Sequence, residues 1–472
     1  MVLDRATVAD AISRLDVAAI ERARWFGAKG RRITAITLDE AFVLDDVAPH
    51  VLAVVTIAID DRERQRYQIA LTGSPLREAQ PGDGSWRALA IAMAAGSVIP
   101  ALPVEEGRAP RAALVCRPGP AMVDGIEDAE ERDLGADQSH TSVVLGETVL
   151  LKAYRRLQAG LNPDLEMTAF LSEEARFSAV PPLAGFAELI EADGGTTTAA
   201  MAQTFIADGR DAFEAVAEAL AAWQLAPGDV SLELATEVAS DLGTLTAGLH
   251  AAVVDGHGLP DMEPRQATRD EVRSWAAMAR ANLDRALDVA PATDGAAATL
   301  RELGPRIGEA ISVLDALPSV PEVIRAHGDY HLGQVLIADD GYRIIDFEGE
   351  PLSPPETRRA HRHALRDVAS MLRSLDHVAG SARRRAERAH GGPLDRSGLD
   401  LSAWRRRARE RFLDAYREGM ADARVWVDQD PDLLLAFEVD QELYNVAYAA
   451  TYLPSWLWAP TEGMRGLFES PR

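Results

Sequence analysis

The sequence predicts an α+β protein in which a sheet-rich first part precedes a mostly helical second part. Three observations support this class. Between residues 33 and 206, short apolar or alternating runs are bounded by turn residues, which is typical of strands. After about residue 208, apolar residues recur with helical spacing, and a strand–loop–strand island at 323–347 interrupts them. Helices are expected at residues 212–224, 230–254, 269–289, 296–314, 363–377, 403–420 and 432–452.

The first part divides again at a segment rich in proline and glycine, residues 100–110. Before it, we expect an amphipathic helix, three strands and a second helix, at residues 3–26, 33–38, 51–59, 66–71 and 86–95. After it, we expect a strand-rich unit over 112–206. This unit contains a hairpin around Gly146-Glu147 and a helix that starts at Asn162-Pro163.

We therefore predict three parts: a mixed cap at 1–105, a small sheet-rich lobe with one helix at 106–206, and a large helical lobe at 207–472. The family resemblance described below identifies them as a cap subdomain, an intermediate subdomain that completes an N-lobe, and a C-lobe. In the helical lobe, the polar, Arg-rich segment 383–400 is predicted to be a loop.

The charge and composition exclude several functions. The 472 residues include 49 basic and 74 acidic side chains, a net charge of −25, which disfavours binding to nucleic acid or to an anionic membrane. Two uncharged stretches, 88–104 and 443–461, are interrupted by prolines and polar residues and are not convincing spans. A single cysteine, Cys116, excludes an internal disulfide framework. We expect a soluble, cytoplasmic protein.

The island contains the residue types that phosphoryl transfer from ATP to a hydroxyl requires. The reaction needs a carboxylate to accept the hydroxyl proton and oxygen ligands to hold Mg²⁺ against the phosphates. Asp329 follows His327-Gly328, Gln334 stands five positions later, and Asp346 ends the next expected strand. Protein kinases show the same order and the same five-residue step. Glu348 is predicted to contribute to the metal site.

A cation that could grip the phosphates is also present. The chain has only two lysines, and one of them, Lys152, ends an expected strand. Glu166 follows fourteen residues later in the next expected helix, which matches the lysine–glutamate arrangement of protein kinases. Upstream, the segment 135–142, with Gln138 and Ser139, is in a position to form the turn over the phosphates.

Each of these features also has a structural interpretation when it is taken alone. A single His-Gly-Asp is usually a turn, Lys152 could be a surface residue, and Glu166 could simply stabilise the start of a helix. Together, in this order and on these elements, they favour a kinase.

The sequence resembles the actinobacterial maltokinase family, aminoglycoside-phosphotransferase-like enzymes with a eukaryotic-protein-kinase-like bilobal fold. The strings that carry the resemblance are residues 327–336, 345–351, 366–374, 138–144 with Lys152, 162–166, and 24–26 with Lys29. The resemblance implies an N-terminal α/β cap subdomain and a mostly helical C-lobe. It also implies that Asp329 is the catalytic base and that Gln334 and Asp346 bind Mg²⁺. Arg366 and Asp367 are predicted to form a buried pair that braces the catalytic loop.

The same resemblance implies a nucleotide site in the N-lobe. Lys152 and Glu166 would form the ion pair that anchors the phosphates of ATP. Residues 203–207, with Gln203 and Phe205, would form the hinge that binds adenine.

The region near the C-terminus departs from the maltokinase pattern. Maltokinases typically carry a Tyr-Glu-x-x-Asn-Arg-Pro-x-Trp-like string, whereas residues 448–458 lack the glutamate and the Asn-Arg pair and keep Pro454 and Trp456. In this respect the sequence looks more like the branch of the family that phosphorylates glucosamine.

Four polar residues suit such an aminosugar, because carboxylates and amide oxygens recognise an ammonium group well. They share one face of the expected helix 432–452 and are Glu438, Gln441, Glu442 and Asn445. Trp456 could supply an apolar platform for the sugar ring. Equally, the polar stripe could be a solvated helix face, and the tryptophan could belong to the core.

The sequence therefore predicts an ATP- and Mg²⁺-dependent sugar kinase, with glucosamine as the favoured acceptor and phosphorylation at its 6-hydroxyl. A maltokinase or an aminoglycoside kinase would share the chemistry but not the acceptor. A non-catalytic pseudokinase scaffold is the alternative from a different class. The expected partner is a small sugar, with no nucleic acid and no membrane, and the expected assembly is a monomer or a simple homodimer.

Overall fold

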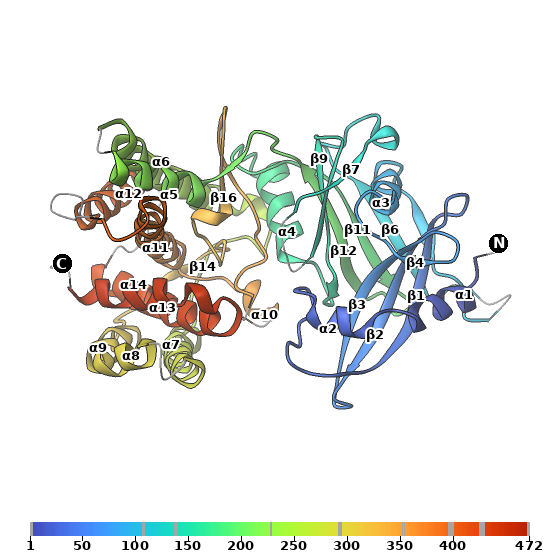
Figure 1. Cartoon of the computed structure of the whole chain (residues 1–472), viewed down its shortest axis with the longest axis horizontal. Coiled ribbons are helices and arrows are strands. Elements are labelled where there is room, and N and C mark those ends of the chain that lie inside the picture. The colour runs from blue at the N-terminus through green and yellow to red at the C-terminus, as the bar shows by residue number, and fades with distance from the viewer. Residues whose placement is uncertain are drawn as a thin grey trace. The chain divides into compact units, whose positions relative to one another are not determined.

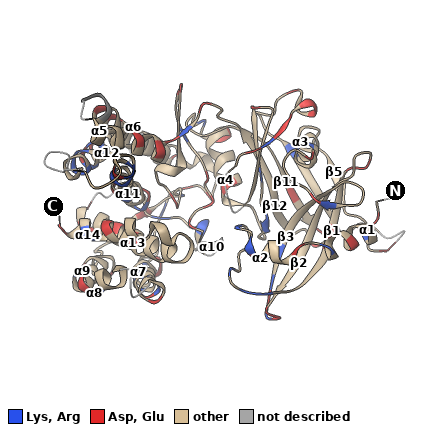
Figure 2. Cartoon of the chain, in the orientation of Figure 1, with Lys and Arg blue, Asp and Glu red and all other residues tan. Residues whose placement is uncertain are grey.

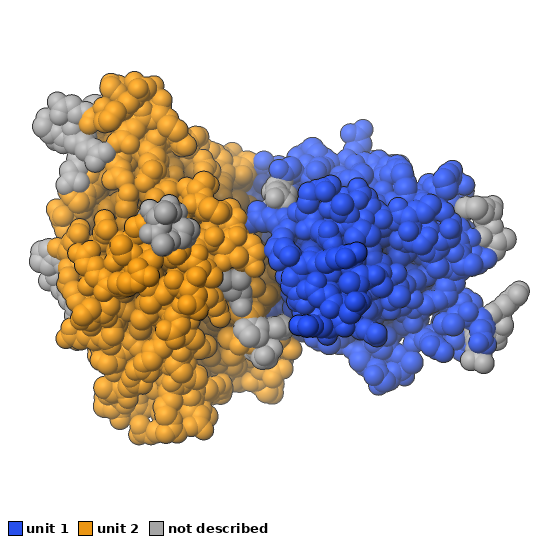
Figure 3. Space-filling model, turned by 60° about the horizontal axis from the view of Figure 1, so that its bottom comes forward, with its two compact units in different colours: residues 1–174, 180–207 blue, residues 175–179, 208–472 orange. Residues whose placement is uncertain are grey.

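The chain forms two units, which Figure 3 shows in different colours. Unit 1 comprises Met1–Glu174 and Val180–Ala207, and unit 2 comprises Ala175–Ala179 and Asp208–Arg472. Basic and acidic residues occur on elements of both units, so neither unit carries one sign of charge alone (Figure 2). The computed structural model describes residues 3–105, 109–135, 140–226, 229–290, 295–351, 353, 355–394, 401–423 and 430–469.

One antiparallel sheet of unit 1 begins the fold, in the strand order β1-β2-β3-β10, with β4 beside β3 (Figure 1). Its strands and the two short helices before it are α1 (Arg5–Ser13), α2 (Val17–Arg22), β1 (Ile33–Asp45), β2 (His50–Ile59), β3 (Glu63–Thr72), β4 (Arg77–Glu78) and β10 (Arg156–Leu157). The apolar side chains of β2 and β3 are buried together with Phe26. Each helix has an aspartate N-cap, Asp4 or Asp16, so the single predicted helix 3–26 is two helices with a break between them.

A second antiparallel sheet of unit 1 has the order β5-β6-β11-β12-β9-β8-β7. Its elements are α3 (Ser85–Ala94), β5 (Val98–Pro100), β6 (Ala112–Pro118), η1 (Ile126–Asp128), β7 (Glu131–Asp133), β8 (Thr141–Leu145), β9 (Val149–Ala153), α4 (Pro163–Ala169), η2 (Phe170–Glu174), β11 (Leu183–Glu191) and β12 (Thr196–Thr204). β8 and β9 form the predicted hairpin, and β9 lies beside β12 in the middle of the sheet. This order fixes the position of Lys152, which is on β9.

Unit 2 is mostly helical. Its helices are α5 (Ala212–Leu225), α6 (Asp229–Val254), α7 (Arg269–Val289), α8 (Ala296–Glu302), α9 (Gly304–Asp315), α10 (Pro355–Arg358), α11 (Leu365–His390), α12 (Ser402–Asp422), α13 (Pro431–Tyr452) and α14 (Trp458–Glu469), with the short turns η3 (Gly256–Gly258), η4 (Leu332–Gln334) and η5 (Pro454–Trp456). Its strands are β13 (Arg210–Asp211), β14 (Arg265–Gln266), β15 (Glu322–Val323), β16 (Val335–Ala338) and β17 (Gly341–Ile344). Helix α11 is buried along most of its length, so it forms the centre of this unit.

The predicted loop at 383–400 is partly wrong, because residues 383–390 continue α11. The many arginines that suggested a loop have partners on other elements. Arg383 pairs with Glu462 at 2.8 Å, and the Arg384 guanidinium lies 3.9 Å from the ring centre of Trp458. The partners are distant in sequence, so local composition could not reveal them.

No helix in the described part of the chain has the length and apolarity that crossing a bilayer requires. The three-part division at residues 105 and 206 and the cytoplasmic location stay predictions.

Candidate active site

The short hairpin β16–β17 of unit 2 brings two residues of the island together. Val335 faces Ile344 across the hairpin, and the Ile345 N–H donates to the Gln334 carbonyl at 2.9 Å. As a result, the side chains just outside the hairpin are neighbours, and the Gln334 amide donates to Asp346 Oδ2 at 3.3 Å. Residues twelve positions apart in sequence therefore share one polar site.

His327 connects this hairpin to the loop that carries Asp329. Its Nε2–H donates to the Ile345 carbonyl at 3.1 Å, and its Nδ1 accepts the Asp329 N–H at 3.3 Å. Both bonds require a neutral imidazole with its proton on Nε2. The ring also packs on Phe347, with 4.6 Å between ring centres. His327 thus ties the backbone of Asp329 to the residue before Asp346.

Asp367 of α11 holds the same loop from the other side. Its carboxylate accepts the N–H groups of His327 at 2.8 Å and Gly328 at 3.0 Å. Burial alone would raise the pKa of Asp367, but the hydrogen bonds that it accepts from His250 and from the Gly328 amide outweigh burial and keep the pKa below its usual value. Gly328 has φ +84°, a conformation that glycine adopts without strain. The predicted Arg366–Asp367 pair is wrong, because Arg366 pairs with Asp440 at 2.9 Å.

Asp329 lies among other carboxylates. Burial contributes most to its raised pKa, and the nearby negative charges of Glu350 and Asp346 add to the effect. Arg362 opposes the shift, and the resulting pKa of Asp329 is about 8. His331 Nε2 is 4.0 Å from Asp329 Oδ2. This environment makes Asp329 a stronger proton acceptor than an ordinary aspartate.

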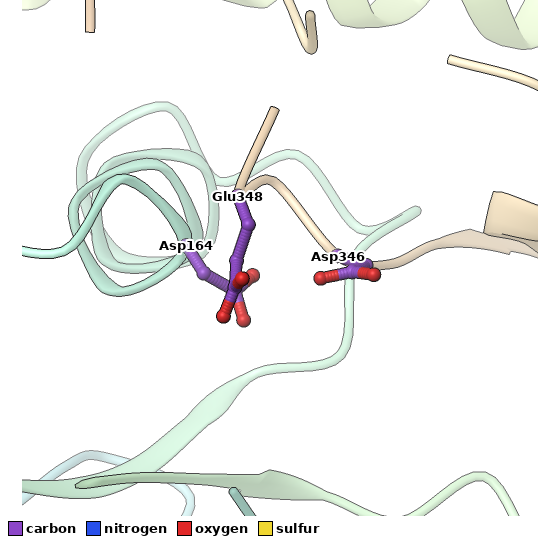
Figure 4. A group of neighbouring side chains, drawn as sticks. All are labelled: Asp164, Asp346 and Glu348. Atoms are coloured by element: carbon purple, nitrogen blue, oxygen red, sulfur yellow. The ribbon is translucent and has the colours of Figure 1, made fainter. Parts of the chain in front are cut away.

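Asp346 and Glu348 lie on the loop that follows β17 (Figure 4). Each offers a carboxylate oxygen within 4.8 Å of the other. Asp346 has φ +67°, which is uncommon for a residue with a side chain and typical of functional sites. Together with the Gln334 amide, the donors are all oxygen-bearing groups of the kind that Mg²⁺ prefers.

In unit 1, several residues that the sequence predicts to bind the nucleotide lie on strand β9 or close to it. Lys152 Nζ donates to Asp164 Oδ2 at 2.8 Å, and both side chains are buried. Asp164, which Figure 4 also labels, lies in the first turn of α4. Asn162 caps this helix, and its side-chain oxygen accepts the N–H of Asp164. The predicted partner, Glu166, lies two residues further along α4 and is also buried. The sequence interpretation thus missed Asp164, a carboxylate that it took only as part of a helix start.

The predicted hinge lies at the end of β12. Gln203 is buried and faces Leu150 of β9 in the strand register. Phe205 follows the strand, and its N–H donates to the Thr148 carbonyl at 2.8 Å. Gln138 and Ser139, predicted for the turn over the phosphates, lie outside the described residues.

The four polar residues of α13 that were predicted to bind the sugar do not form one open face. Glu438 and Glu442 are fully buried and bound by basic side chains of neighbouring helices. Glu438 accepts N–H groups from Arg373 of α11 and Arg409 of α12, and Glu442 pairs with His377 at 3.0 Å. The two carboxylates were predicted to face a ligand, but this packing directs them toward neighbouring helices instead.

The other predicted sugar residues are only half-buried. Gln441 Nε2 donates to Asn445 Oδ1 at 3.3 Å, so they are neighbours on one side of α13. Trp456, in the turn after α13, lies edge-on to His377 with ring centres 5.0 Å apart. These three side chains keep accessible surface in unit 2.

Comparison with known proteins connects this geometry to a family. The maltokinase N-terminal cap domain model matches residues 20–97. A glucosamine kinase of Streptacidiphilus jiangxiensis is 32% identical over 431 residues, which is 89% of this chain and 88% of that protein. The chain belongs to the glucosamine kinase family. Another member, from Mycolicibacterium smegmatis, is 29% identical over 340 residues, 72% of this chain and 80% of that protein.

Solved structures of this family agree over the whole chain. A glucosamine kinase in complex with glucosamine, ADP and inorganic phosphate is 26% identical, with a TM-score of 0.70 over 98% of this chain and 99% of that one. Another crystal form of a glucosamine kinase gives a TM-score of 0.74 over 98% and 97% of the two chains. The α+β, kinase-like fold class predicted from the sequence is confirmed.

Proposed function

We propose that this protein is an ATP-dependent glucosamine kinase that transfers the terminal phosphoryl group of ATP to the 6-hydroxyl of glucosamine. The observation that carries the proposal is the likeness over 431 residues to a protein named glucosamine kinase, 32% identical. The geometry of the island supports the reaction type, since its side chains match those that phosphoryl transfer needs.

Asp329 acts as the base. It accepts the proton of the sugar hydroxyl as the oxygen attacks the γ-phosphorus and the bond to the β-phosphate oxygen breaks. The hydrogen bonds of His327 and Asp367 hold its loop in place. Because a fixed base raises the fraction of productive encounters, this anchoring contributes directly to the rate.

Gln334, Asp346 and Glu348 are proposed to hold Mg²⁺. The residues fit the ion because all three offer oxygen donors, and turning the Gln334 amide by 180° presents its oxygen in place of its nitrogen. Bound there, Mg²⁺ neutralises charge that develops on the transferred phosphoryl group.

The nucleotide is proposed to bind through unit 1. Lys152 grips the α- and β-phosphates, and its ion pair with Asp164 fixes the direction of the ammonium group. Glu166 completes the acidic partners on α4. Gln203 and Phe205 are proposed to contact adenine.

Gln138 and Ser139 are proposed to contact the phosphates. The three-part division, with a cap at 1–105, an N-lobe at 106–206 and a C-lobe at 207–472, is part of the same proposal. So are a monomer or simple homodimer and a cytoplasmic location.

The acceptor sugar is proposed to bind Gln441 and Asn445 through their amide groups and Trp456 through its ring face. Glu438 and Glu442 are not proposed as direct ligands. They hold the arginines and the histidine of the neighbouring helices α11 and α12 in place.

Maltose is the second candidate acceptor, because the maltokinase cap model matches residues 20–97. The test is the release of ADP in the presence of glucosamine, maltose, glucose or an aminoglycoside, each at several concentrations. We expect the highest kcat/KM with glucosamine, and phosphorus NMR of the product should show a phosphate ester on C6. A higher kcat/KM with maltose would identify maltose, in place of glucosamine, as the acceptor. No ADP release with any sugar would favour the pseudokinase alternative.

A further inference from the structure

Three buried polar side chains from three helices of unit 2 form a chain of hydrogen bonds behind the Asp329 loop. Tyr416 of α12 lies 3.0 Å from His250 Nδ1 of α6, and His250 Nε2 lies 3.3 Å from Asp367 Oδ2 of α11. His250 has no exposed surface, and Tyr416 and Asp367 are almost as completely buried. None of these atoms belongs to the phosphate, metal or sugar groups named above.

The direction of each bond follows from the chemistry of the groups. The Asp367 carboxylate accepts two loop amides, from His327 and Gly328, so it also accepts the proton on His250 Nε2. In the neutral imidazole with its proton on Nε2, Nδ1 is the acceptor, and it receives the Tyr416 O–H. The chain therefore runs from α12 through α6 to α11 and ends on the two amides that precede Asp329.

The close approach of α6 and α12 makes the Tyr416–His250 bond possible. A side chain at Gly243 would place its Cβ 2.3 Å from the Phe412 carbonyl oxygen, and a Cβ at Gly419 would lie 2.6 Å from the Ala247 Cβ. Both contacts are too short for any larger residue. Glycines at these two positions thus let the helices cross near the bond.

Helix α6 holds the loop at a second point. Thr246, one helical turn before His250, shares a hydrogen bond of 3.2 Å with the hydroxyl of Tyr330, the residue after Asp329. The residues on both sides of Asp329 are thereby connected to α6: Tyr330 directly through its hydroxyl, and the backbone of His327 and Gly328 through Asp367.

We propose that His250 and Tyr416 are positioning residues for phosphoryl transfer. They fix the Asp367 carboxylate, which fixes the loop of the base, and they touch neither substrate nor nucleotide. This inference rests on the proposed function, because it assigns the loop to catalysis. It predicts that damage to the Tyr416–His250 bond lowers kcat and leaves the KM values for ATP and glucosamine nearly unchanged, since both ligands bind elsewhere.

The first test is Tyr416→Phe, which removes one hydroxyl and keeps the ring that stacks on Phe412. We expect kcat to fall about tenfold, because small displacements of a catalytic group are costly, with both KM values within about twofold of the wild type. Tyr342→Phe is the matched control. It removes a hydroxyl that also bonds to α6, at Asp241 over 2.7 Å, but lies outside the chain of bonds. Its kcat should equal that of the wild type.

The second test replaces His250. His250→Leu should lower kcat about 100-fold, and His250→Gln, whose amide N–H can replace Nε2–H toward Asp367, should recover part of the loss. Equal kcat in the wild type, Tyr416→Phe and His250→Leu would overturn the proposal. So would a loss of kcat in His250→Gln as large as in His250→Leu.

Hydrogen exchange separates this inference from the proposed function. Amide exchange in the peptide that contains residues 325–332 should be faster in Tyr416→Phe than in the wild type, and unchanged in Tyr342→Phe. Exchange in Tyr416→Phe that is no faster than in the wild type would overturn the positioning role whatever the substrate is. Faster exchange in Tyr416→Phe, combined with no ADP release by the wild type, would support the anchoring of the loop and reject the kinase.

Discussion

Each unit contains a buried cluster of oppositely charged side chains. The sequence does not distinguish the two clusters, but the structure shows that their charges are bound differently. In unit 1, Lys152 donates to one oxygen of Asp164. In unit 2, Glu438 accepts four N–H groups, two from Arg373 and two from Arg409. Three of these N–H groups point to Oε1 and one to Oε2, so both oxygens of Glu438 are bound within the protein.

The difference shows how a buried charge should be interpreted. Burial raises the pKa of Glu438, but the charges of Arg409 and Arg373 outweigh it and keep the pKa below its usual value. Glu438 is therefore an ionised anchor among three helices, and an aminosugar would have to displace arginines to reach it. The comparison assigns Glu438 to the fold. The following experiments challenge this assignment and test the roles proposed above for Lys152 and the island.

The largest effect is expected for Asp346→Ala in the island. Loss of this carboxylate should lower kcat/KM with glucosamine by at least about 10³-fold, because several kcal/mol of charge stabilisation are lost with the metal. Binding of a non-hydrolysable ATP analogue, measured by calorimetry, should no longer depend on Mg²⁺. Unchanged Mg²⁺ dependence would refute the ligand role of Asp346.

Glu438→Gln tests the structural side of the comparison. It leaves two guanidinium groups without their carboxylate, so the free energy of unfolding should fall by about 3–5 kcal/mol. The KM for glucosamine should stay within twofold, as measured at a temperature where the variant is folded. Glu462→Gln, which breaks an exposed pair with Arg383, is the control and should cost less than about 1 kcal/mol. A raised KM with undiminished stability would make Glu438 a sugar ligand after all.

Lys152→Met tests the other buried pair. Removing the ammonium group should reduce kcat/KM for ATP about 100-fold, with a smaller effect on the melting temperature. The other lysine provides the control, since Lys29 donates to the Arg22 carbonyl at 3.0 Å at the end of α2. Lys29→Met should change stability slightly and leave the kinetics with ATP unaltered. Similar kinetics for both variants would remove Lys152 from the nucleotide site.

The smallest effect concerns pH. Burial, with a contribution from Arg366, lowers the pKa of His363 to about 3. The unfolded chain protonates this group near pH 6.5 and the folded chain only near pH 3, so the unfolded state binds more protons in that window and stability falls as the pH falls. His363→Asn keeps an acceptor for the Leu365 N–H but cannot be protonated.

The loss of stability between pH 7 and pH 5, measured by urea unfolding, should therefore be about 2 kcal/mol smaller in His363→Asn than in the wild type. An equal loss in the two proteins would contradict the assignment of a neutral, buried imidazole.

Local patterns predicted much of this structure. The β8–β9 hairpin, the helix start at Asn162-Pro163 and the island hairpin depend on neighbouring residues, and all three were found as expected. The sequence patterns did not predict the helix breaks at residues 14–16 and 303, or the extension of α11 to His390. These features depend on helix caps and on partners far along the chain.

For the candidate site, the sequence could not show which group each carboxylate faces. The periodicity of α13 placed Glu438 and Glu442 on one face, and that face meets α11. Arg373 and His377 have the same four-residue spacing on α11, so two matched i,i+4 pairs were present in the sequence. Complementary charges at equal spacing on two helices are the signal that could have identified an internal contact. Nothing comparable marked Asp164.

The central claim is that Asp329, held by its anchored loop, accepts the proton of a glucosamine hydroxyl. The most direct measurement is the initial rate of ADP formation with saturating glucosamine and ATP in the wild type and in Asp329→Asn, with ATP affinity measured on the same samples. The account predicts a loss of kcat of about 10³-fold with ATP affinity nearly unchanged. A variant that turns over glucosamine at the wild-type rate would contradict it.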